Sequence, residues 1–327
     1  MLKKRFYILL FFCLLLGGNV NSSTVDKGDN NAPFENKRTE TDYLPIADPF
    51  VMLYNNKYYA YGTGGTVNEG FACFSSDDLK NWKRERQALS ADDSYGKWGF
   101  WAPEVYYIQS KKKFYMFYSV EEHICVATSD SPVGPFRQES KQPIWEEKSI
   151  DTSLFIDDDG TPYLYFVRFT DGNVIWVAQM TDDLMKIKKE TLSECIKAEE
   201  PWELLQAKVA EGPSLLKKNG VYYLIYSANH YENKGYGVGY ATSDTPMGPW
   251  VKYSKNPLLQ GDAATGLVGT GHGAPFQCKD GSWKYIFHAH WSAAEIQPRT
   301  SYIEDFAISD QGVVTISGTV IKPRVLK

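Results

Sequence analysis

Three carboxyl groups of the chain, Asp48, Asp151 and Glu211, each begin a short apolar run. Every one of these runs is followed by a turn rich in Asn, Asp or Gly and then by a second run rich in aromatic residues, which is the order of a β-hairpin. Carboxyl groups that face each other can do general acid–base chemistry, because one donates a proton while the other activates water. For each acid alone, a strand-entry cap or a solvated turn is the alternative interpretation. Three acids in similar places favour a reactive site.

The hairpins are parts of a longer repeat. Closely similar segments at 124–136 and 239–250 supply a third strand to the second and fourth units. The five units open at Asp48, Pro103, Asp151, Glu211 and His272. These openings are 48 to 61 residues apart, enough for a four-stranded antiparallel sheet with its loops, and no helical period runs through the units.

Small sheets repeated in this way predict an all-β chain with a single domain, a five-bladed β-propeller over residues 42–327. A β-sandwich or a β-helix would fit the strand content, but neither explains units this long with the same order of strands. In a propeller the innermost strand of each blade lines a central channel. The opening residues of all five units should therefore converge at one end of that channel.

The N-terminus has the pattern of a secretory signal peptide. Three basic residues precede the unbroken apolar run 6–16, and small and polar residues follow it. We therefore expect a signal peptide over residues 1–23, a flexible leader over 24–41, and an exported protein that is periplasmic or extracellular. The run is too short to span a membrane. Cys13 lies inside the apolar run rather than after small residues, which makes a lipid-anchored form the less expected alternative.

The composition narrows the classes of partner. A net charge of −5 without a basic stripe makes nucleic acid an unexpected partner. Aromatic residues make up 15% of the chain, which suits both strands and surfaces that stack on sugars. Four cysteines beyond the N-terminal segment lie far apart in sequence, so we expect neither a disulfide framework nor a zinc site (Cys73, Cys125, Cys195 and Cys278).

The motifs that open the five units resemble those of glycoside hydrolase family 43, from about residue 42 to the C-terminus. They are Ala47-Asp48-Pro49, Trp101-Ala102-Pro103-Glu104, Ile150-Asp151-Thr152-Ser153, Glu211-Gly212-Pro213-Ser214 and Gly269-Thr270-Gly271-His272-Gly273. The resemblance implies a five-bladed propeller that hydrolyses arabinose- or xylose-containing glycans with inversion. It implies that Asp48 is the catalytic base, that Asp151 tunes a pKa, and that Glu211 is the general acid. Such a mechanism needs the acid and the base on opposite sides of the sugar.

Other residues are candidates for binding the substrate or an ion. Trp101, together with Phe100, would form an apolar sugar platform or else belong to the core. By resemblance, Arg299 hydrogen-bonds a terminal sugar, with a surface arginine as the alternative. His272 would lie near the axis, where relatives hold a calcium or another ion with water, or it is a core histidine. Glu104 lies one position inside its strand and is interpreted as structural or as a hydrogen-bonding group of the pocket wall.

Two further histidines, His288 and His290, share one face of a strand, but no third ligand is evident, so a dedicated metal site there is not expected. The chemistry itself should need no cofactor; a structural calcium at the axis is the one ion that the resemblance implies.

The expected function is that of an exported α-L-arabinofuranosidase that acts on an oligo- or polysaccharide, without a membrane-spanning segment. Within the same family, β-D-xylosidase, endo-arabinanase and a galactofuranose- or galactan-active hydrolase are alternatives. Many xylosidase relatives carry a further β-sandwich, and the strand-like segment 313–320 is close to the end of this sequence, which makes β-xylosidase less expected. A non-catalytic sugar-binding propeller or a protein-interaction propeller would have no use for opposed carboxylates.

Overall fold

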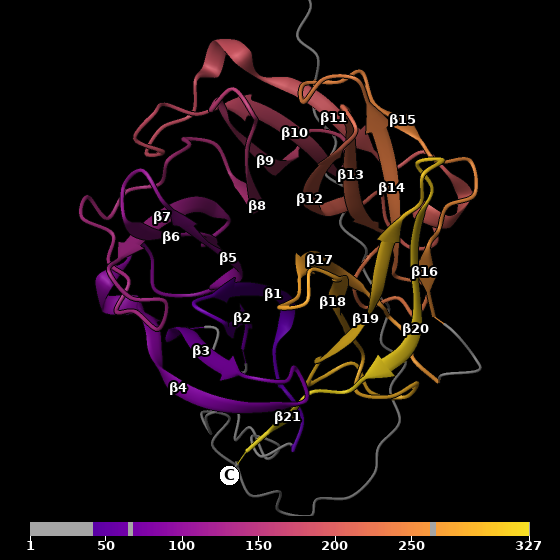
Figure 1. Ribbon diagram of the computed structural model, residues 1–327. Coiled ribbons are helices and arrows are strands. Elements are labelled where there is room, and N and C mark those ends of the chain that lie inside the picture. The colour runs from indigo at the N-terminus through magenta and orange to yellow at the C-terminus, as the bar shows by residue number, and fades with distance from the viewer. Residues whose placement is uncertain (1–41, 65–67, 262–265, 327) are drawn as a thin grey trace, which may run out of the picture. The chain divides into compact units, whose positions relative to one another are not determined.

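The computed structural model describes residues 42–64, 68–261 and 266–326, all within one compact unit, Arg38–Lys327. The predicted signal peptide (1–23) and leader (24–41) lie outside the described residues. Five antiparallel sheets stand around a central axis, as Figure 1 shows. The prediction of a single-domain, five-bladed β-propeller is confirmed.

Each blade is a run of consecutive strands, with the first strand nearest the axis. Blade one contains β1 (Ala47–Tyr54), β2 (Lys57–Thr63), β3 (Gly70–Ser76) and β4 (Asn81–Ser90). Blade two contains β5 (Trp101–Ile108), β6 (Lys113–Val120) and β7 (His123–Ser129). Blade three contains β8 (Ser149–Ile156), β9 (Pro162–Phe169), β10 (Asn173–Gln179) and β11 (Ser193–Lys197).

Blade four contains β12 (Ala210–Lys218), β13 (Val221–Ala228), β14 (Gly237–Ser243) and the short β15 (Val251–Lys252) and β16 (Leu259–Gln260), which both pair with β14. Blade five contains β17 (Gly271–Gln277), β18 (Trp283–Ala289), β19 (Thr300–Ile308) and β20 (Val314–Ile321). The last strand, β21 (Arg324–Val325), runs parallel to β4. Short 3-10 turns η1 (Ala91–Asp93), η2 (Lys189–Thr191) and η3 (Pro201–Glu203) lie between strands.

Turn residues and burial explain why these segments pair. Asn55 and Asn56 adopt positive φ of 47° and 61°, as do Asn219 and Gly220 at 53° and 82°, which is the backbone of a two-residue hairpin turn. In β6, every residue after Lys113 is buried. Middle strands are apolar on both faces because each sheet packs between two neighbouring blades, as in sheet-on-sheet packing generally.

Each innermost strand carries a β-bulge at the same place, where pairing with the second strand shifts register. The central residue of the bulge has positive φ in every blade: Asp48 (49°), Ala102 (46°), Asp151 (56°), Gly212 (55°) and His272 (38°). Bulges are common next to active sites, because they redirect side chains. This equivalence corrects two of the predicted openings. Ala102 and Gly212, not Pro103 and Glu211, correspond to Asp48, and Glu211 therefore comes one residue before its bulge.

The bulges also link neighbouring blades. At three junctions, the backbone N–H of the bulge residue donates to a hydroxyl on the second strand of the preceding blade: Ala102 to Thr63 (3.0 Å), Asp151 to Ser119 (2.9 Å) and His272 to Ser227 (2.7 Å). Between blades three and four, the corresponding residue is the apolar Val167. There the carboxyl group of Asp151 accepts the hydrogen bond from Gly212 N instead, at 3.3 Å.

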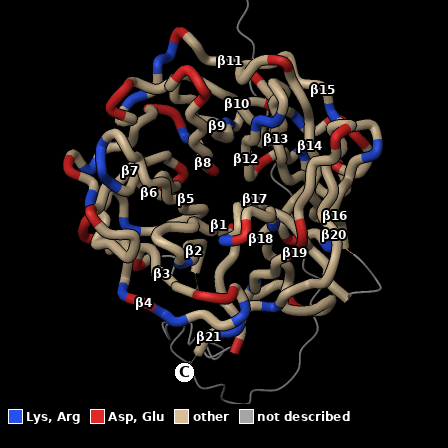
Figure 2. The backbone as a smooth tube through the Cα atoms, in the orientation of Figure 1, with Lys and Arg blue, Asp and Glu red and all other residues tan. Residues whose placement is uncertain are grey.

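The start of the described chain closes the ring against blade five. Leu44 N–H donates to the carbonyl of Pro323, and Ser301 donates through its N–H to Leu44 and through its hydroxyl to the Ile46 carbonyl. Charged residues of both signs lie mainly along the outer strands and loops (Figure 2). Among the described residues, none of the helical segments has the length and apolar character needed to cross a bilayer. The four cysteines of the blades are free thiols.

Candidate active site

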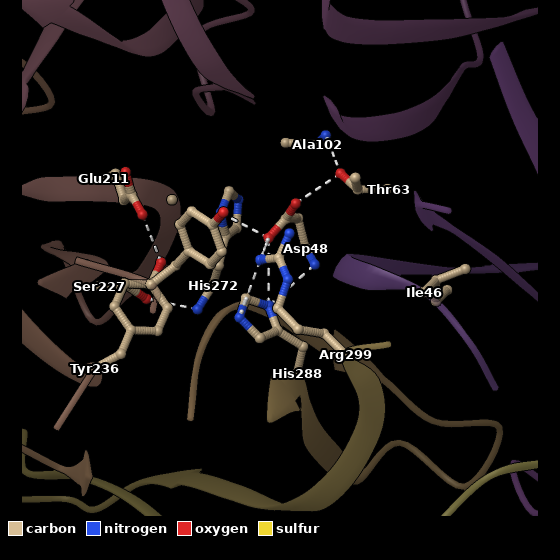
Figure 3. A network of polar contacts seen from close by, with 12 residues as sticks. Ile46, Asp48, Thr63, Ala102, Glu211, Ser227, Tyr236, His272, His288 and Arg299 are labelled. Atoms are coloured by element: carbon tan, nitrogen blue, oxygen red, sulfur yellow. Dashed lines mark hydrogen bonds and ion pairs between the residues drawn. The ribbon is translucent and has the colours of Figure 1, made fainter. Parts of the chain in front are cut away.

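The carboxylate of Asp48 is surrounded by hydrogen-bond donors from blades one and five. Arg299 Nη1 lies 3.0 Å from its Oδ1, and the hydroxyl of Thr63 donates to its Oδ2 at 2.6 Å (Figure 3). Burial alone would raise the pKa of Asp48. The charge of Arg299, followed by the contacts with His272 and His288, outweighs burial and holds that pKa well below its usual value. Asp48 is therefore ionised over the whole neutral range.

His288 determines how Asp48 is oriented. Its Nδ1 lies 3.1 Å from the backbone nitrogen and 3.3 Å from Oδ1 of Asp48, and its Nε2 lies 3.3 Å from Arg299 Nη1. The backbone N–H of Asp48 donates to Nδ1, so this nitrogen is an acceptor and the ring holds the backbone at the bulge. Burial and then the charge of Arg299 lower the pKa of His288 to about 3, and the ring stays neutral.

Asp151 and Glu211 form a close pair of carboxyl groups. One oxygen of each lies within 4.8 Å of the other. Burial, followed by the charge of Asp48, raises the pKa of Asp151 to about 8, and burial, followed by the charge of Asp151, raises the pKa of Glu211 to about 7. A negative charge on one member makes the other harder to ionise. The pair therefore retains a proton at neutral pH while Asp48 does not.

Two neutral donors hold the side chain of Glu211. The hydroxyl of Tyr236 donates to Oε1 at 2.8 Å, and the amide of Asn173 donates to Oε2 at 2.9 Å. Neither donor carries a charge, in contrast to the arginine beside Asp48. Both carboxyl groups are thus held by hydrogen bonds but differ in proton affinity, and in Figure 3 they lie on opposite sides of the His272 side chain.

His272 lies between the acids. Its Nδ1 is 3.4 Å from Asp48 Oδ1 and 3.7 Å from Asp151 Oδ2. One of its nitrogens and one oxygen each of Asp151 and Glu211 are all within 4.8 Å of one another. Calcium takes six to eight oxygen ligands, and this group offers two carboxylates and an imidazole, so water would have to supply most of the shell. The structure places His272 at the acids; an axial calcium, with His272 as its ligand, stays a prediction.

Arg299 comes from the segment just before β19. Besides its bond to Asp48, its guanidinium lies over the ring of Tyr231, 4.6 Å from the ring centre. Its Nε has no hydrogen-bond partner among the described residues. The alternative interpretation, a surface arginine, is thus wrong: the side chain is 11% exposed and contacts Asp48. Its predicted contact with a sugar stays a prediction.

The structure removes one of the two residues of the aromatic platform predicted at 100–101. Phe100 is fully buried and packs against Phe71 and Tyr118, between blades one and two. Trp101 is partly exposed and comes one residue before the bulge of β5, as Glu211 does in β12. Phe100 is therefore a core residue, and Trp101 alone remains a candidate for contacting substrate.

Glu104 makes its hydrogen bond outside the group formed by Asp48, Asp151 and Glu211. Its side chain is hydrogen-bonded by the hydroxyl of Tyr106, which also accepts a bond from Leu154 N–H at 3.1 Å. Burial raises the pKa of Glu104 to about 8. These contacts agree with the interpretation of Glu104 as a structural group of the inner wall.

Little in the sequence indicates which residues hold the acids. Thr63, Asn173 and Tyr236 are single polar residues in or beside strands, and nothing in their local pattern distinguishes them from others. The sequence suggests only a shared strand face for His288 and His290, and in the structure Nε2 of His290 lies 2.8 Å from the carbonyl oxygen of Tyr231. The alternation that puts both rings on one face was the available signal, but it could not indicate a carboxylate partner from another blade.

Comparisons with known proteins agree with this geometry. Residues 44–314 match the model for glycosyl hydrolases family 43. A solved structure from Bacteroides thetaiotaomicron, described as an endo-1,4-beta-xylanase, is 91% identical with a TM-score of 0.87, over 88% of this chain and 99% of that one.

Two curated relatives are more distant. The beta-D-galactofuranosidase of Aspergillus niger is 27% identical over 75% of this chain and 74% of its own length. The arabinoxylan arabinofuranohydrolase of Bacillus subtilis is 29% identical over 74% of this chain, which spans only 55% of that relative. Since the family match runs through all five blades and the predicted resemblance is thereby confirmed, the chain belongs to glycosyl hydrolases family 43.

Proposed function

We propose that this glycoside hydrolase acts with inversion and removes terminal α-L-arabinofuranosyl residues from plant-type glycans. The observation that carries the mechanism is the contrast between two acids of the same site, Asp48 and Glu211. Asp48 is held ionised by Arg299, whereas burial and then the charge of Asp151 raise the pKa of Glu211 to about 7, so that it can carry a proton near neutral pH. Inverting hydrolysis needs this pairing, an ionised base and a protonated acid.

In the proposed reaction, the carboxylate of Asp48 takes a proton from a water molecule, whose oxygen attacks the anomeric carbon. The bond from that carbon to the leaving oxygen breaks on the opposite face, and Glu211 gives its proton to this oxygen. Asp48 ends protonated and Glu211 ionised, and exchange with solvent restores both. Asp151 is a positioning residue, which favours the proton on Glu211 by its charge and holds the backbone of Gly212 by its hydrogen bond.

The sugar specificity rests on the relatives. The similarity to the arabinofuranohydrolase supports an arabinofuranosyl substrate for this chain. The 91% identity to a structure described as an endo-1,4-beta-xylanase makes an activity on β-1,4-xylan the second candidate. We also propose that the protein acts outside the cytoplasm, because of the signal-like pattern over residues 1–23. Turnover of aryl α-L-arabinofuranoside, β-D-xyloside and β-D-galactofuranoside, together with product analysis on arabinan, arabinoxylan and xylan, tests the assignment. No turnover on the whole panel would favour a sugar-binding propeller.

The anomeric configuration of the first product tests the mechanism. We expect the released sugar to appear with the opposite configuration to the substrate, because water attacks from the face that Asp48 occupies. Proton NMR during the first minutes of reaction, before mutarotation, measures it. A product of unchanged configuration would show a covalent intermediate and a different pair of carboxyl groups.

Asp151→Asn should shift the pH profile. Glu211 must be protonated to act, so the alkaline limb of kcat/KM follows its pKa, and removal of the Asp151 charge lowers that pKa. The alkaline limb should therefore move to lower pH, with each pKa unit corresponding to about 1.4 kcal/mol. Asparagine keeps an oxygen that can accept the bond from Gly212 N–H. A uniform loss of activity without a shift of the limb would assign Asp151 a role in substrate binding instead.

A further inference from the structure

Trp98 is unusually exposed for its type. All nine tryptophans of the chain lie in its described part. The side chain of Trp98 is the most exposed of them at 49%, followed by Trp283 at 37%. Exposed tryptophan is costly for a soluble protein, since its ring carries a large apolar surface. A single exposed ring can be incidental, so the argument depends on how Trp98 is held and on what lies beside it.

The backbone around Trp98 is fixed on both sides. Glu121 N–H donates to the carbonyl of Trp98 at 3.2 Å, and the Glu121 carboxylate accepts from Lys97 N–H at 2.8 Å. Gly99 N–H donates to the side chain of Asn68 at 3.3 Å. Trp98 is therefore presented to solvent by an anchored backbone segment, which loses little conformational freedom when the ring binds a ligand.

The same ring adjoins the candidate active site. Trp98 contacts Trp101 edge to face, with ring centres 6.4 Å apart and planes at 78°. Trp101 pairs with Ser119, whose hydroxyl accepts the hydrogen bond from Asp151 N–H at 2.9 Å. The peptide that follows Trp101 is tied through Thr63 to Asp48. Trp98 thus contacts a residue whose backbone is linked to Asp48 and Asp151, and Trp98 is the more exposed of the two tryptophans.

The burial of the acids gives the direction of a bound glycan. Asp48 is 8% exposed and Asp151 is 5% exposed, so the sugar that reacts must reach inward to them. The part of the glycan that is attached through the leaving oxygen must then extend from the buried acids toward solvent. A flat indole on the rim can stack against the C–H face of a pyranose ring, as aromatic residues do with apolar surfaces generally.

We propose that Trp98 is the stacking surface of a leaving-group subsite, which binds a pyranose ring of an oligo- or polysaccharide, such as a xylose unit of a main chain. This inference rests on the proposed hydrolase function and deepens it. It makes the enzyme selective for glycosidic bonds whose leaving group is itself a sugar ring. Trp98 then contributes through binding the leaving group and takes no part in proton transfer.

The test compares two substrates that share the sugar to be cleaved. One has an oligosaccharide as leaving group, and the other is the corresponding glycosyl fluoride, whose leaving group has no ring. Trp98→Ala should lower kcat/KM on the oligosaccharide by about tenfold, equivalent to about 1.4 kcal/mol, and change it on the fluoride by less than about twofold. Trp98→Tyr should keep most of the oligosaccharide activity, while Trp98→Leu, which is apolar but not flat, should lose it.

Trp283→Ala is the matched control. Trp283 is also exposed, but it begins β18 and pairs with Gln277 at the end of the hairpin away from the bulge of β17. This variant should leave both substrates unchanged. Equal oligosaccharide activity in Trp98→Ala and wild type would overturn the subsite, and so would an equal loss on both substrates. Failure of the wild type to hydrolyse either substrate would count against the proposed function. The subsite is tested by a different quantity, the ratio of kcat/KM between Trp98→Ala and wild type on each substrate.

Discussion

Replacing Glu211 by Gln should lower kcat on a natural glycan by about 10²–10⁴-fold, the usual contribution of a placed general acid. The reason is that the amide has no proton to give to the leaving oxygen. The substitution should be mild for the fold. The Gln oxygen can accept from Asn173 Nδ2, and its amide can donate to the hydroxyl of Tyr236, so that both contacts of Glu211 are preserved.

The dependence on the leaving group distinguishes this role from a structural one. On the glycosyl fluoride, whose leaving group needs no proton from the enzyme, Glu211→Gln should lose far less activity than on the glycan. A comparable loss on both substrates would show that Glu211 is not the acid. Glu190→Gln, at an exposed position of η2, is the control and should behave as wild type.

Asp48→Asn should also reduce kcat by about 10²–10⁴-fold, because asparagine cannot accept the proton of the attacking water. The loss should appear on the fluoride and on the glycan alike, since both need an activated water. The substitution also leaves Arg299 without its counter-ion, and breaking a buried ion pair costs several kcal/mol. We therefore expect a lower Tm as well, measured by calorimetry, and kcat should be determined at temperatures where the variant is folded.

Chemical rescue separates the loss of a base from the loss of stability. Asp48→Gly opens space for azide, a nucleophile that needs no proton removed. Azide should restore turnover of the fluoride and form a glycosyl azide of inverted configuration. An azide product of retained configuration would assign Asp48 to a different mechanism, and full activity of Asp48→Asn without azide would remove it from the chemistry. Asp77→Asn, at an exposed site, is the control.

The repeat was visible in the sequence because its signals are local. Hairpin turns such as Asn219-Gly220 depend on neighbouring residues only, and alternation within a strand is a property of a few positions. Five such units therefore predicted the number of blades. The bulge could not be recognised in the sequence, because it is defined by the pairing between two strands. Once the bulges are aligned, the residues equivalent to Asp48 in blades two and four are Ala102 and Gly212. The burial of Phe100 was missed for the same reason, since the opposing rings belong to other strands.

The sequence by itself determined which residue types could react: three acids at the starts of repeated hairpins that had to meet near one axis. Only the tertiary structure decided their different states. Asp48 meets His288 and Arg299 across 240 and 251 residues of chain, and the charge of Arg299 keeps it ionised. Glu211 meets the uncharged donors of Asn173 and Tyr236 together with the nearby Asp151, and burial together with the charge of Asp151 raises its pKa. A proton affinity depends on burial and on neighbouring charge, and both arise only when blades distant in sequence close into a ring.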